Sequence, residues 1–432
     1  MTIPVVLQQF ILLLNSLVDR IWIAHIPDVG ELAFTASGIC VPIIYIIFAL
    51  SELVGTGIAP RVGWLLGNGN RAEAERTLGA FVIFDILLAL FVCLAIETFI
   101  HELIAGFGGD AATSPLATTY LRIATPGYAL NIVAAGLAPF LLAQGHSRLA
   151  ATILGTGIGL NLLLDPLFIF GFGWGIAGAA WATTLSGFAS AALAVGFTYR
   201  NHELRLRRSN LHLSWRLMRP CLALGLTPMA LVMAETLQLG VYNRLLLHLG
   251  GDMAIGAIAL VVVLYDFFYF PVYGMAYGAQ PITSYNLGAG QPERALANVQ
   301  MLMKSTLVWS LVVWVLMVFF TAPIVSLVLG NVPLSAFAAP LVRLSFIVCF
   351  VGMLQFVCQN TLQAMNHPKT TFCLGLSQTV LLLPLVVVLP RLFPSSATKS
   401  VFLARPIVDI IVCIITLSIL LKYIKQFKTS KI

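Results

Sequence analysis

The sequence predicts an all-α polytopic membrane protein whose twelve transmembrane helices form two six-helix bundles, related by a pseudo-twofold axis along the membrane normal. Three observations support this fold class: an apolar composition, a series of long apolar runs and an internal repeat. Of the 432 residues, 59% are hydrophobic and 9% are Asp, Glu, Lys or Arg, whereas about 25% of the residues of a soluble domain are charged. With a mean hydropathy of +0.96, this much apolar surface requires lipid as its solvent.

Twelve apolar runs are long enough to cross a bilayer, because a helix needs about 20 apolar residues to span roughly 30 Å of hydrocarbon. The first six runs lie near residues 2–25, 36–66, 78–100, 117–143, 150–172 and 176–199. The second six lie near residues 217–248, 254–287, 301–328, 338–365, 370–390 and 401–423. The first run lacks a basic n-region and a small-residue cleavage site, so we interpret it as a retained span and not as a signal peptide.

An internal repeat divides the chain into two halves. The segment that starts at Gly57 matches the segment that starts at Gly278, an offset of 221 residues, in the pairs Pro60/Pro281, Leu66/Leu287, Gly67/Gly288, Gly69/Gly290 and Ala74/Ala295. The same offset pairs Ala143 with Ala364 and His146 with His367. We therefore expect an N-lobe at 1–199, a basic linker at 200–216 and a C-lobe at 217–432. Six spans in each lobe is an even number, which places the symmetry axis along the membrane normal.

The basic residues between the spans are distributed unequally over the two sides. One side receives the loop at 200–219, the tail lysines and most of the other loop arginines, whereas the opposite side receives Arg391 and Lys399. This asymmetry is the positive-inside pattern and predicts that both termini are cytoplasmic. It also explains the net charge of +7 without nucleic acid as a partner.

Motifs for catalysis and cofactors are absent from the sequence. The seven cysteines are scattered through apolar runs without paired spacing, which indicates small buried side chains and neither disulfides nor a zinc site. No G-x-x-x-x-G-K-[ST] loop is present, so the chain has no ATP site of this kind. We expect no enzyme activity, no cofactor and no obligatory protein partner.

Polar residues that occur in only one half are candidates for function. Asn161 and Asp165 lie four residues apart in the fifth run, and their counterpart span at 370–390 is apolar apart from Ser377, Gln378 and Thr379. Asn15 and Asp19 have the same spacing in the first run, and such pairs share a helix face. A carboxylate at membrane depth costs about 2.5–3.5 kcal/mol and marks a functional site by default.

If the first and fifth helices meet, these carboxylates and amides form a cluster of oxygen ligands. Hard cations prefer such a cluster, and desolvation together with like charge also favours protonation. Proton and sodium are both suitable occupants. The alternative is structural: Asp165 caps a helix break before Pro166, and Asp19 pairs with Arg20.

The C-terminal half offers weaker candidates for a substrate site or a second polar site. Glu235 lies in the seventh run with Gln238 on its face, and Asp266 lies among aromatic residues. Aromatic faces attract amphiphilic cations, although packing is the alternative role. The tenth run contains no acid and offers Gln355 in its place. Glu52, Asp85 and Glu97 are single acids without an evident partner, and Arg405 with Asp409 is interpreted as a structural pair.

Several segments resemble the MATE (multidrug and toxic compound extrusion) family, in particular its DinF-like and MepA-like bacterial branch. They are NSLVDRIWIAH, GTGIAPRVGWLLGNGNRAEAERTLG, GLNLLLDPLFIFGFGWGIAGAAWAT and FPVYGMAYGAQPITSYNLGAGQPERA. The resemblance implies an ion-coupling site at Asp19, Asn161, Asp165 and Thr183. If the coupling ion is sodium, the same four residues would be its ligands. It implies a helix hinge at Pro4, and Glu235 matches the seventh-span acid of another branch.

The resemblance implies a proton- or sodium-coupled antiporter that exports amphiphilic, often cationic compounds by alternating access from the bacterial inner membrane. The alternative is a lipid-linked precursor flippase of the wider superfamily. Such a flippase needs clustered cationic residues, whereas the membrane-embedded arginines here are dispersed. A channel or a structural membrane protein would leave the acids of the N-terminal half unexplained.

Overall fold

The structure, a computed structural model, describes residues 6–7, 11, 15, 18–19, 21–23, 25–27, 29–200, 204–329 and 333–429. Every element in this part of the chain is a helix. Ten helices are long and apolar enough to cross a membrane, and one bent pair makes an eleventh span. Most of the predicted first span, at 2–25, lies outside the described residues. The all-helical, polytopic fold class is therefore confirmed.

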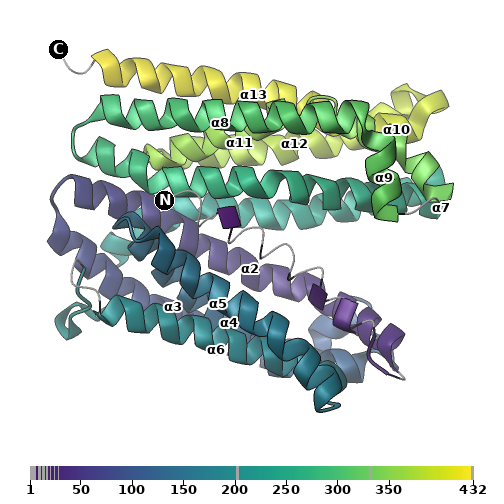
Figure 1. Cartoon of the computed structure of the whole chain (residues 1–432), viewed down its shortest axis with the longest axis horizontal. Helices are drawn as coiled ribbons and strands as arrows, with labels where there is room; N and C mark the ends of the chain where they lie inside the picture. Colours follow the sequence, from purple (N-terminus) through teal and green to yellow (C-terminus); the bar gives the residue numbers. More distant parts are fainter. Residues whose placement is uncertain are drawn as a thin grey trace.

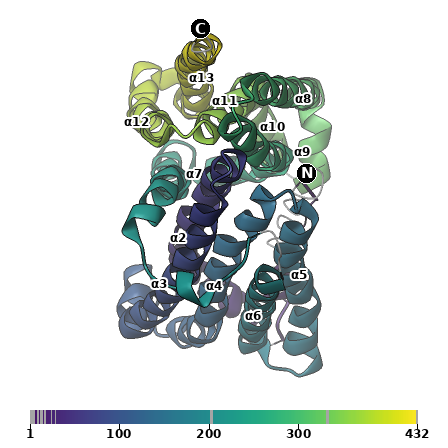
Figure 2. The ribbon, with the colours of Figure 1, turned by 90° about the vertical axis from the view of Figure 1, so that its left-hand side faces the viewer.

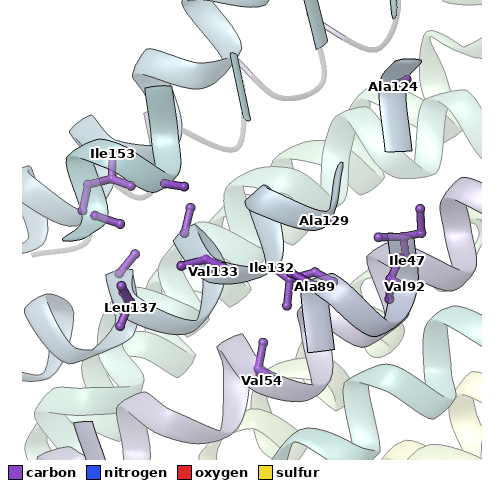
Figure 3. Close-up of a cluster of buried hydrophobic side chains, with 14 of the residues drawn as sticks. Ile47, Val54, Ala89, Val92, Ala124, Ala129, Ile132, Val133, Leu137 and Ile153 are labelled. Carbon is purple, nitrogen blue, oxygen red and sulfur yellow. The ribbon is translucent and has the colours of Figure 1, made fainter. Parts of the chain in front are cut away.

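The N-terminal bundle contains five described helices. They are α2 (Gly30–Gly67), α3 (Arg71–Gly106), α4 (Ser114–Ala143), α5 (Ser147–Pro166), which continues into a short π-helix (Leu167–Gly171), and α6 (Gly175–Arg200). Aliphatic side chains of α2, α3, α4 and α5 meet in its core (Figure 3). Ile132 and Leu137 of α4 are fully buried there, with Val54 of α2.

The C-terminal bundle begins with α7 (Trp215–Gly288), which holds two spans, Trp215–Gly251 and Met253–Gly288. The break falls at Gly251, where the backbone has φ 62°. The bundle continues with α8 (Pro292–Phe319), α9 (Thr321–Leu329), α10 (Pro333–Phe346), α11 (Cys349–Ala364), α12 (Pro368–Leu392) and α13 (Ala397–Thr429).

Two spans expected as single helices are broken. The run at 301–328 is divided at Phe320 into α8 and α9. Pro323 follows in the first turn of α9. A proline is tolerated in the first turn of a helix, whereas it would break the interior of one continuous helix. The run at 338–365 is bent by 47° between α10 and α11. Helical periodicity continues across both breaks, so the apolar pattern did not reveal them.

The repeat is reproduced in the turns between helices. Gly69 and Gly290, which are 221 positions apart, both have positive φ, at 74° and 67°. Gly145 and Asn366 form the second such pair, at 92° and 64°. Glycine adopts this left-handed conformation without strain, and Asn is the side-chain residue that visits it most readily. Equivalent turns in the two bundles therefore have the same backbone form.

These turns lie at one end of the molecule, together with the linker and the C-terminus. We call it the basic end; in Figure 1 it is on the left. Figure 2 looks onto this end and shows α8–α13 as one group, α3–α6 as the other, and α2 beside α7 where the groups meet. The lobe boundaries expected at 1–199, 200–216 and 217–432 remain a prediction.

The two bundles touch most closely near the basic end. A Cβ placed on Gly57 of α2 would lie 1.9 Å from the carbonyl oxygen of Cys221, and one on Gly225 would lie 1.9 Å from that of Leu53. Gly67 and Gly288 make similarly close backbone approaches to the opposite bundle. From this contact the α2 and α7 ribbons diverge toward the other end (Figure 1). Glycine permits this contact because any side chain would collide with backbone.

Candidate functional site

The structure brings Asp19 and Asp165 together. The two carboxyl groups lie close enough to interact electrostatically, and Asn161 Nδ2 donates a hydrogen bond to Asp165 Oδ1 at 3.3 Å. Asp165 and Asn161 are buried, and Asp19 is half-buried. Two neighbouring carboxylates repel each other, and a proton or a cation between them would remove that repulsion.

Thr183 lies on α6 opposite this cluster. Gly157 of α5 packs against Ser186 and Ser190 of α6, and Gly178 packs against Phe168. Between these contacts the antiparallel helices bring Thr183 to the level of Asn161 and Asp165. Its hydroxyl donates to the Ala179 carbonyl at 3.1 Å, which leaves the oxygen lone pairs as acceptors. The predicted ligand role of Thr183 is thus compatible with its position.

Two tyrosines of α4 complete the cluster, and the sequence reasoning did not include them. The hydroxyls of Tyr120 and Tyr128 are 3.1 Å apart, and both side chains lie within electrostatic range of Asp19. Their spacing of eight residues places them on one face of α4. Each hydroxyl donates as well as accepts, so the pair is able to orient a proton or to ligate a cation.

The structural alternatives for the two acids are pairing of Asp19 with Arg20 and capping of a helix break by Asp165. Arg20, the proposed partner of Asp19, and Pro4, the predicted hinge, lie outside the described residues. Asp165 precedes a π-helical turn, and such turns occur frequently at functional sites. Its side chain meets Asn161 and Asp19, so it is directed into the bundle. The role of the cluster as an ion site remains a prediction.

A second acidic region lies between the two bundles. Glu52 of α2 and Glu235 of α7 interact electrostatically across the junction, and Glu235 also interacts with Asp266 on the second span of α7. Glu52 is half-buried, whereas Glu235 and Asp266 are exposed. The sequence alone did not predict this neighbour of Glu52, because Glu235 belongs to the other half of the chain.

Tyrosines at four-residue spacing form a ladder beside these acids. Tyr265, Tyr269, Tyr273 and Tyr277 follow one face of α7, with ring centroids 5.4, 5.9 and 6.5 Å apart in order. Tyr273 also meets Phe356 of α11 at 4.6 Å. The four-residue spacing of the tyrosines is visible in the sequence. Whether their rings pack in a core or line a cavity depends on the helices around them. Here Tyr273 and Tyr277 lie within electrostatic range of Glu235 and Glu52, whereas Tyr269 is packed in the core of the C-terminal bundle.

The C-terminal bundle pairs its most buried acid with a base. Asp409 of α13 is 1% exposed and lies 3.9 Å from Arg405 Nε. Gln378 Nε2 donates to Asp409 Oδ1 at 3.0 Å, and the Arg405 guanidinium lies over the ring of Tyr265 at 5.1 Å. These contacts agree with the interpretation of Arg405 and Asp409 as a pair.

The two glutamines among the candidates have their amides engaged inside the bundle. Gln238 Nε2 donates to Thr379 Oγ1 at 2.7 Å, and Gln355 Nε2 donates to Gln359 Oε1 at 3.1 Å. Both side chains are buried. The accessible acids Glu235 and Asp266 are therefore better placed than these glutamines to meet a substrate.

Three membrane-embedded arginines of the described residues form individual ion pairs. Arg61 pairs with Glu73 at 3.2 Å, and Arg122 pairs with Glu97 at 2.9 Å. Glu97, which the sequence left without an evident partner, thus has one. With Arg405 paired as well, these arginines do not form the cationic cluster that a pyrophosphate-binding flippase requires.

Comparisons with known proteins find relatives over most of the chain. The MatE family model matches residues 4–167 and 228–388. The chain is 26% identical to a FAD transporter of Shewanella oneidensis, over 95% of this chain and 91% of that protein. It is 21% identical to the multidrug export protein MepA of Staphylococcus aureus, over 91% of this chain and 86% of that protein.

Solved structures share the fold. An outward-facing multidrug resistance MATE family transporter of the MOP superfamily superimposes with a TM-score of 0.90 at 18% identity, covering 99% of this chain and 95% of that chain. A MOP superfamily transporter from Pyrococcus furiosus superimposes with a TM-score of 0.88 at 19% identity, again over 99% and 95%. At these identities the likeness establishes the arrangement of helices and not the substrate.

Proposed function

The chain belongs to the MATE family of membrane transporters, and on this premise we propose that it is a cation-coupled antiporter that exports amphiphilic, cationic compounds. The observation that carries the proposal is the meeting of Asp19 and Asp165 in the N-terminal bundle. A proton or a sodium ion binds between these carboxyl groups. Its release leaves two negative charges in contact, which destabilises the packing around them.

The substrate occupies the region between the bundles. Glu52, Glu235 and Asp266 provide negative charge there, and the tyrosine ladder provides aromatic faces. A cation with an apolar body is attracted by both features. Since ion and substrate favour opposite arrangements of the bundles, exchange requires only a few kcal/mol of differential affinity.

The orientation follows from the loop charges. If the basic end is cytoplasmic, as the positive-inside rule requires, the bundles are closed on the cytoplasmic side and diverge on the outer side. The structure then represents an outward-facing arrangement in the inner membrane. The contacts of Gly57 and Gly225 with the opposite backbone form the closed end, and alternating access opens it.

Cellular efflux tests the proposal. Expression in a drug-sensitised bacterial host is expected to raise resistance to ethidium, and Asp165→Asn is expected to remove this gain at equal protein abundance. Unchanged resistance for well-expressed Asp165→Asn would contradict the ion-coupling role. In everted vesicles, where export is measured as uptake into the lumen, replacing sodium by choline distinguishes the ions. Sodium coupling predicts that uptake is lost, whereas proton coupling predicts uptake that persists until the pH gradient is collapsed.

A second candidate substrate is a flavin dinucleotide. The relative from Shewanella oneidensis that is 26% identical over 95% of this chain is a FAD transporter. A flavin ring stacks on aromatic faces as an organic cation does, and Arg405 lies beside the ladder at Tyr265. The same vesicles, with FAD or with ethidium added to the outer medium, decide between the two. FAD transport without ethidium transport would replace the substrate class and leave the antiport mechanism unchanged.

A further inference from the structure

A groove of about 690 Å³ opens between the first turns of α7 and α12, outside the region where the bundles meet. Its walls combine basic, aromatic and aliphatic side chains: Trp215, Arg216, Arg219, Pro220, Ala223 and Leu226 of α7, with Pro368, Lys369 and Phe372 of α12. The α7 members recur every three to four residues, so they belong to one face of the helix.

Three of the wall residues carry uncompensated positive charge. Arg216, Arg219 and Lys369 are exposed, and none of them forms an ion pair within the part of the chain that the structure describes. Their charges converge from two helices that are far apart in the sequence. Such a groove attracts an anion more strongly than isolated surface lysines do.

A second basic pocket contains a carboxylate of its own. It is lined by Arg71, Glu75, Arg205 and Arg207. There Glu75 accepts from the Arg205 backbone at 3.2 Å and pairs with Arg207 at 3.3 Å. The protein supplies its own anion in that pocket, whereas the described residues supply none to the groove between α7 and α12.

The groove changes from polar to apolar along the axis of α7. Leu226 lies seven residues beyond Arg219, which is about 10 Å deeper along the helix. Phe372 and Ala223 line the wall on the way. Trp215, which is 65% exposed, stands at the rim, where tryptophan is enriched at membrane–water interfaces. An amphiphile with an anionic head and an aliphatic tail matches this gradient, and a water-soluble anion matches only its polar half.

We propose that this groove binds an anionic phospholipid of the adjacent leaflet. The phosphodiester lies among Arg216, Arg219 and Lys369, and an acyl chain follows Ala223, Leu226 and Phe372. Basic pockets between transmembrane helices are suited to such headgroups. The lipid binds α7 on the side opposite Cys221 and Gly225, the residues that meet α2. It therefore supports the helical turns that close the basic end.

Retention of lipid by the full-length chain tests the proposal. The protein is purified in detergent with equal amounts of dioleoylphosphatidylglycerol and dioleoylphosphatidylcholine and examined by native mass spectrometry. The groove variant combines Arg216→Gln, Arg219→Gln and Lys369→Gln. The matched control combines Arg76→Gln, Arg148→Gln and Arg294→Gln, which removes equal charge from exposed arginines of the basic end outside the groove.

The wild-type chain and the control are expected to retain phosphatidylglycerol in preference to phosphatidylcholine. The groove variant is expected to bind phosphatidylglycerol on the order of a hundredfold more weakly, since three interfacial basic residues are lost. Equal retention by the groove variant overturns the proposal. Monodisperse elution and ethidium transport by the groove variant establish that it is folded.

Thermal unfolding separates a lipid from a soluble anion. Added phosphatidylglycerol is expected to raise the Tm of the wild-type chain and not that of the groove variant, because a ligand stabilises only the state that binds it. Glycerol 3-phosphate at the same concentration is expected to leave both Tm values unchanged. An equal rise with glycerol 3-phosphate overturns the lipid as occupant and identifies a site for soluble phosphates.

Discussion

In the N-terminal bundle the buried carboxyl of Asp165 meets a second carboxyl, that of Asp19, whereas in the C-terminal bundle the buried carboxyl of Asp409 meets the guanidinium of Arg405. The first arrangement places like charges together, and the second contains its own cation. Since the bundles share a repeat, the proposed mechanism assigns ion coupling to the N-terminal cluster and a structural role to the Asp409–Arg405 pair.

Neutralising the two acids in parallel gives the largest expected contrast. Asp165→Asn is expected to reduce ethidium efflux to the level of the empty vector, because the cation site loses a charge. Asp409→Asn is expected to retain efflux but to lower stability by about 3–5 kcal/mol, since a buried pair loses one partner. Vesicle efflux and thermal unfolding measure the two effects. Full activity of Asp165→Asn with loss of activity in Asp409→Asn would reverse the roles assigned to the bundles.

The contact between the bundles at the basic end is expected to respond to a single methyl group. In Gly57→Ala the new Cβ collides with the Cys221 carbonyl, so the closed end is disfavoured. With Cys221 as the sole remaining cysteine, maleimide labelling of this residue is expected to accelerate roughly tenfold, which corresponds to about 1.4 kcal/mol.

Gly38→Ala is the matched control for that substitution. It lies on the same helix, and its Cβ would meet nothing within 4 Å. Labelling is expected to match that of the parent chain. If Gly57→Ala and Gly38→Ala label Cys221 at the same rate, the basic end is not closed by this glycine contact.

The tyrosine ladder is expected to set affinity for organic cations more weakly than the acids do. Tyr273→Leu removes one aromatic face beside Glu235 and is expected to raise the half-saturating ethidium concentration roughly threefold. Tyr273→Phe keeps the ring and is expected to restore the affinity. Concentration-dependent efflux measures both variants. An equal loss in Tyr273→Phe would assign the effect to the hydroxyl and not to the aromatic face.

The smallest effect concerns the turn before α12, the C-terminal copy of a turn that both bundles contain. His367, in the turn before α12, stacks on Tyr423 at 4.0 Å, and burial lowers the pKa of its imidazole. Below pH of about 6.5 the unfolded chain therefore takes up a proton that the folded chain refuses, and stability falls with falling pH.

Replacing this histidine tests the sign of that dependence. His367→Gln is expected to flatten the decrease of Tm below pH 6.5 by on the order of 1 °C. His212→Gln, at an exposed position of the linker, is expected to leave the profile unchanged. A steeper decrease in His367→Gln would show that the imidazole is protonated in the folded state.

The sequence by itself determined the fold class. Its apolar runs and the repeat at an offset of 221 predicted a polytopic, two-bundle helical protein, because each depends only on local composition and spacing. The paired turns at Gly69 and Gly290 and at Gly145 and Asn366 carry that repeat into the backbone. The breaks at Phe320 and between α10 and α11 were not predicted, since the apolar runs continue through them.

Only the tertiary structure decided which polar groups meet. Asn161 and Asp165 share a helix face by spacing alone, but their approach to Asp19, to Tyr120 and to Tyr128 depends on how three helices pack. The pairing of Glu52 with Glu235 joins opposite halves of the chain. Spacing along a helix fixes direction around its own axis, whereas proximity between helices is set by packing, and packing is a property of the whole molecule.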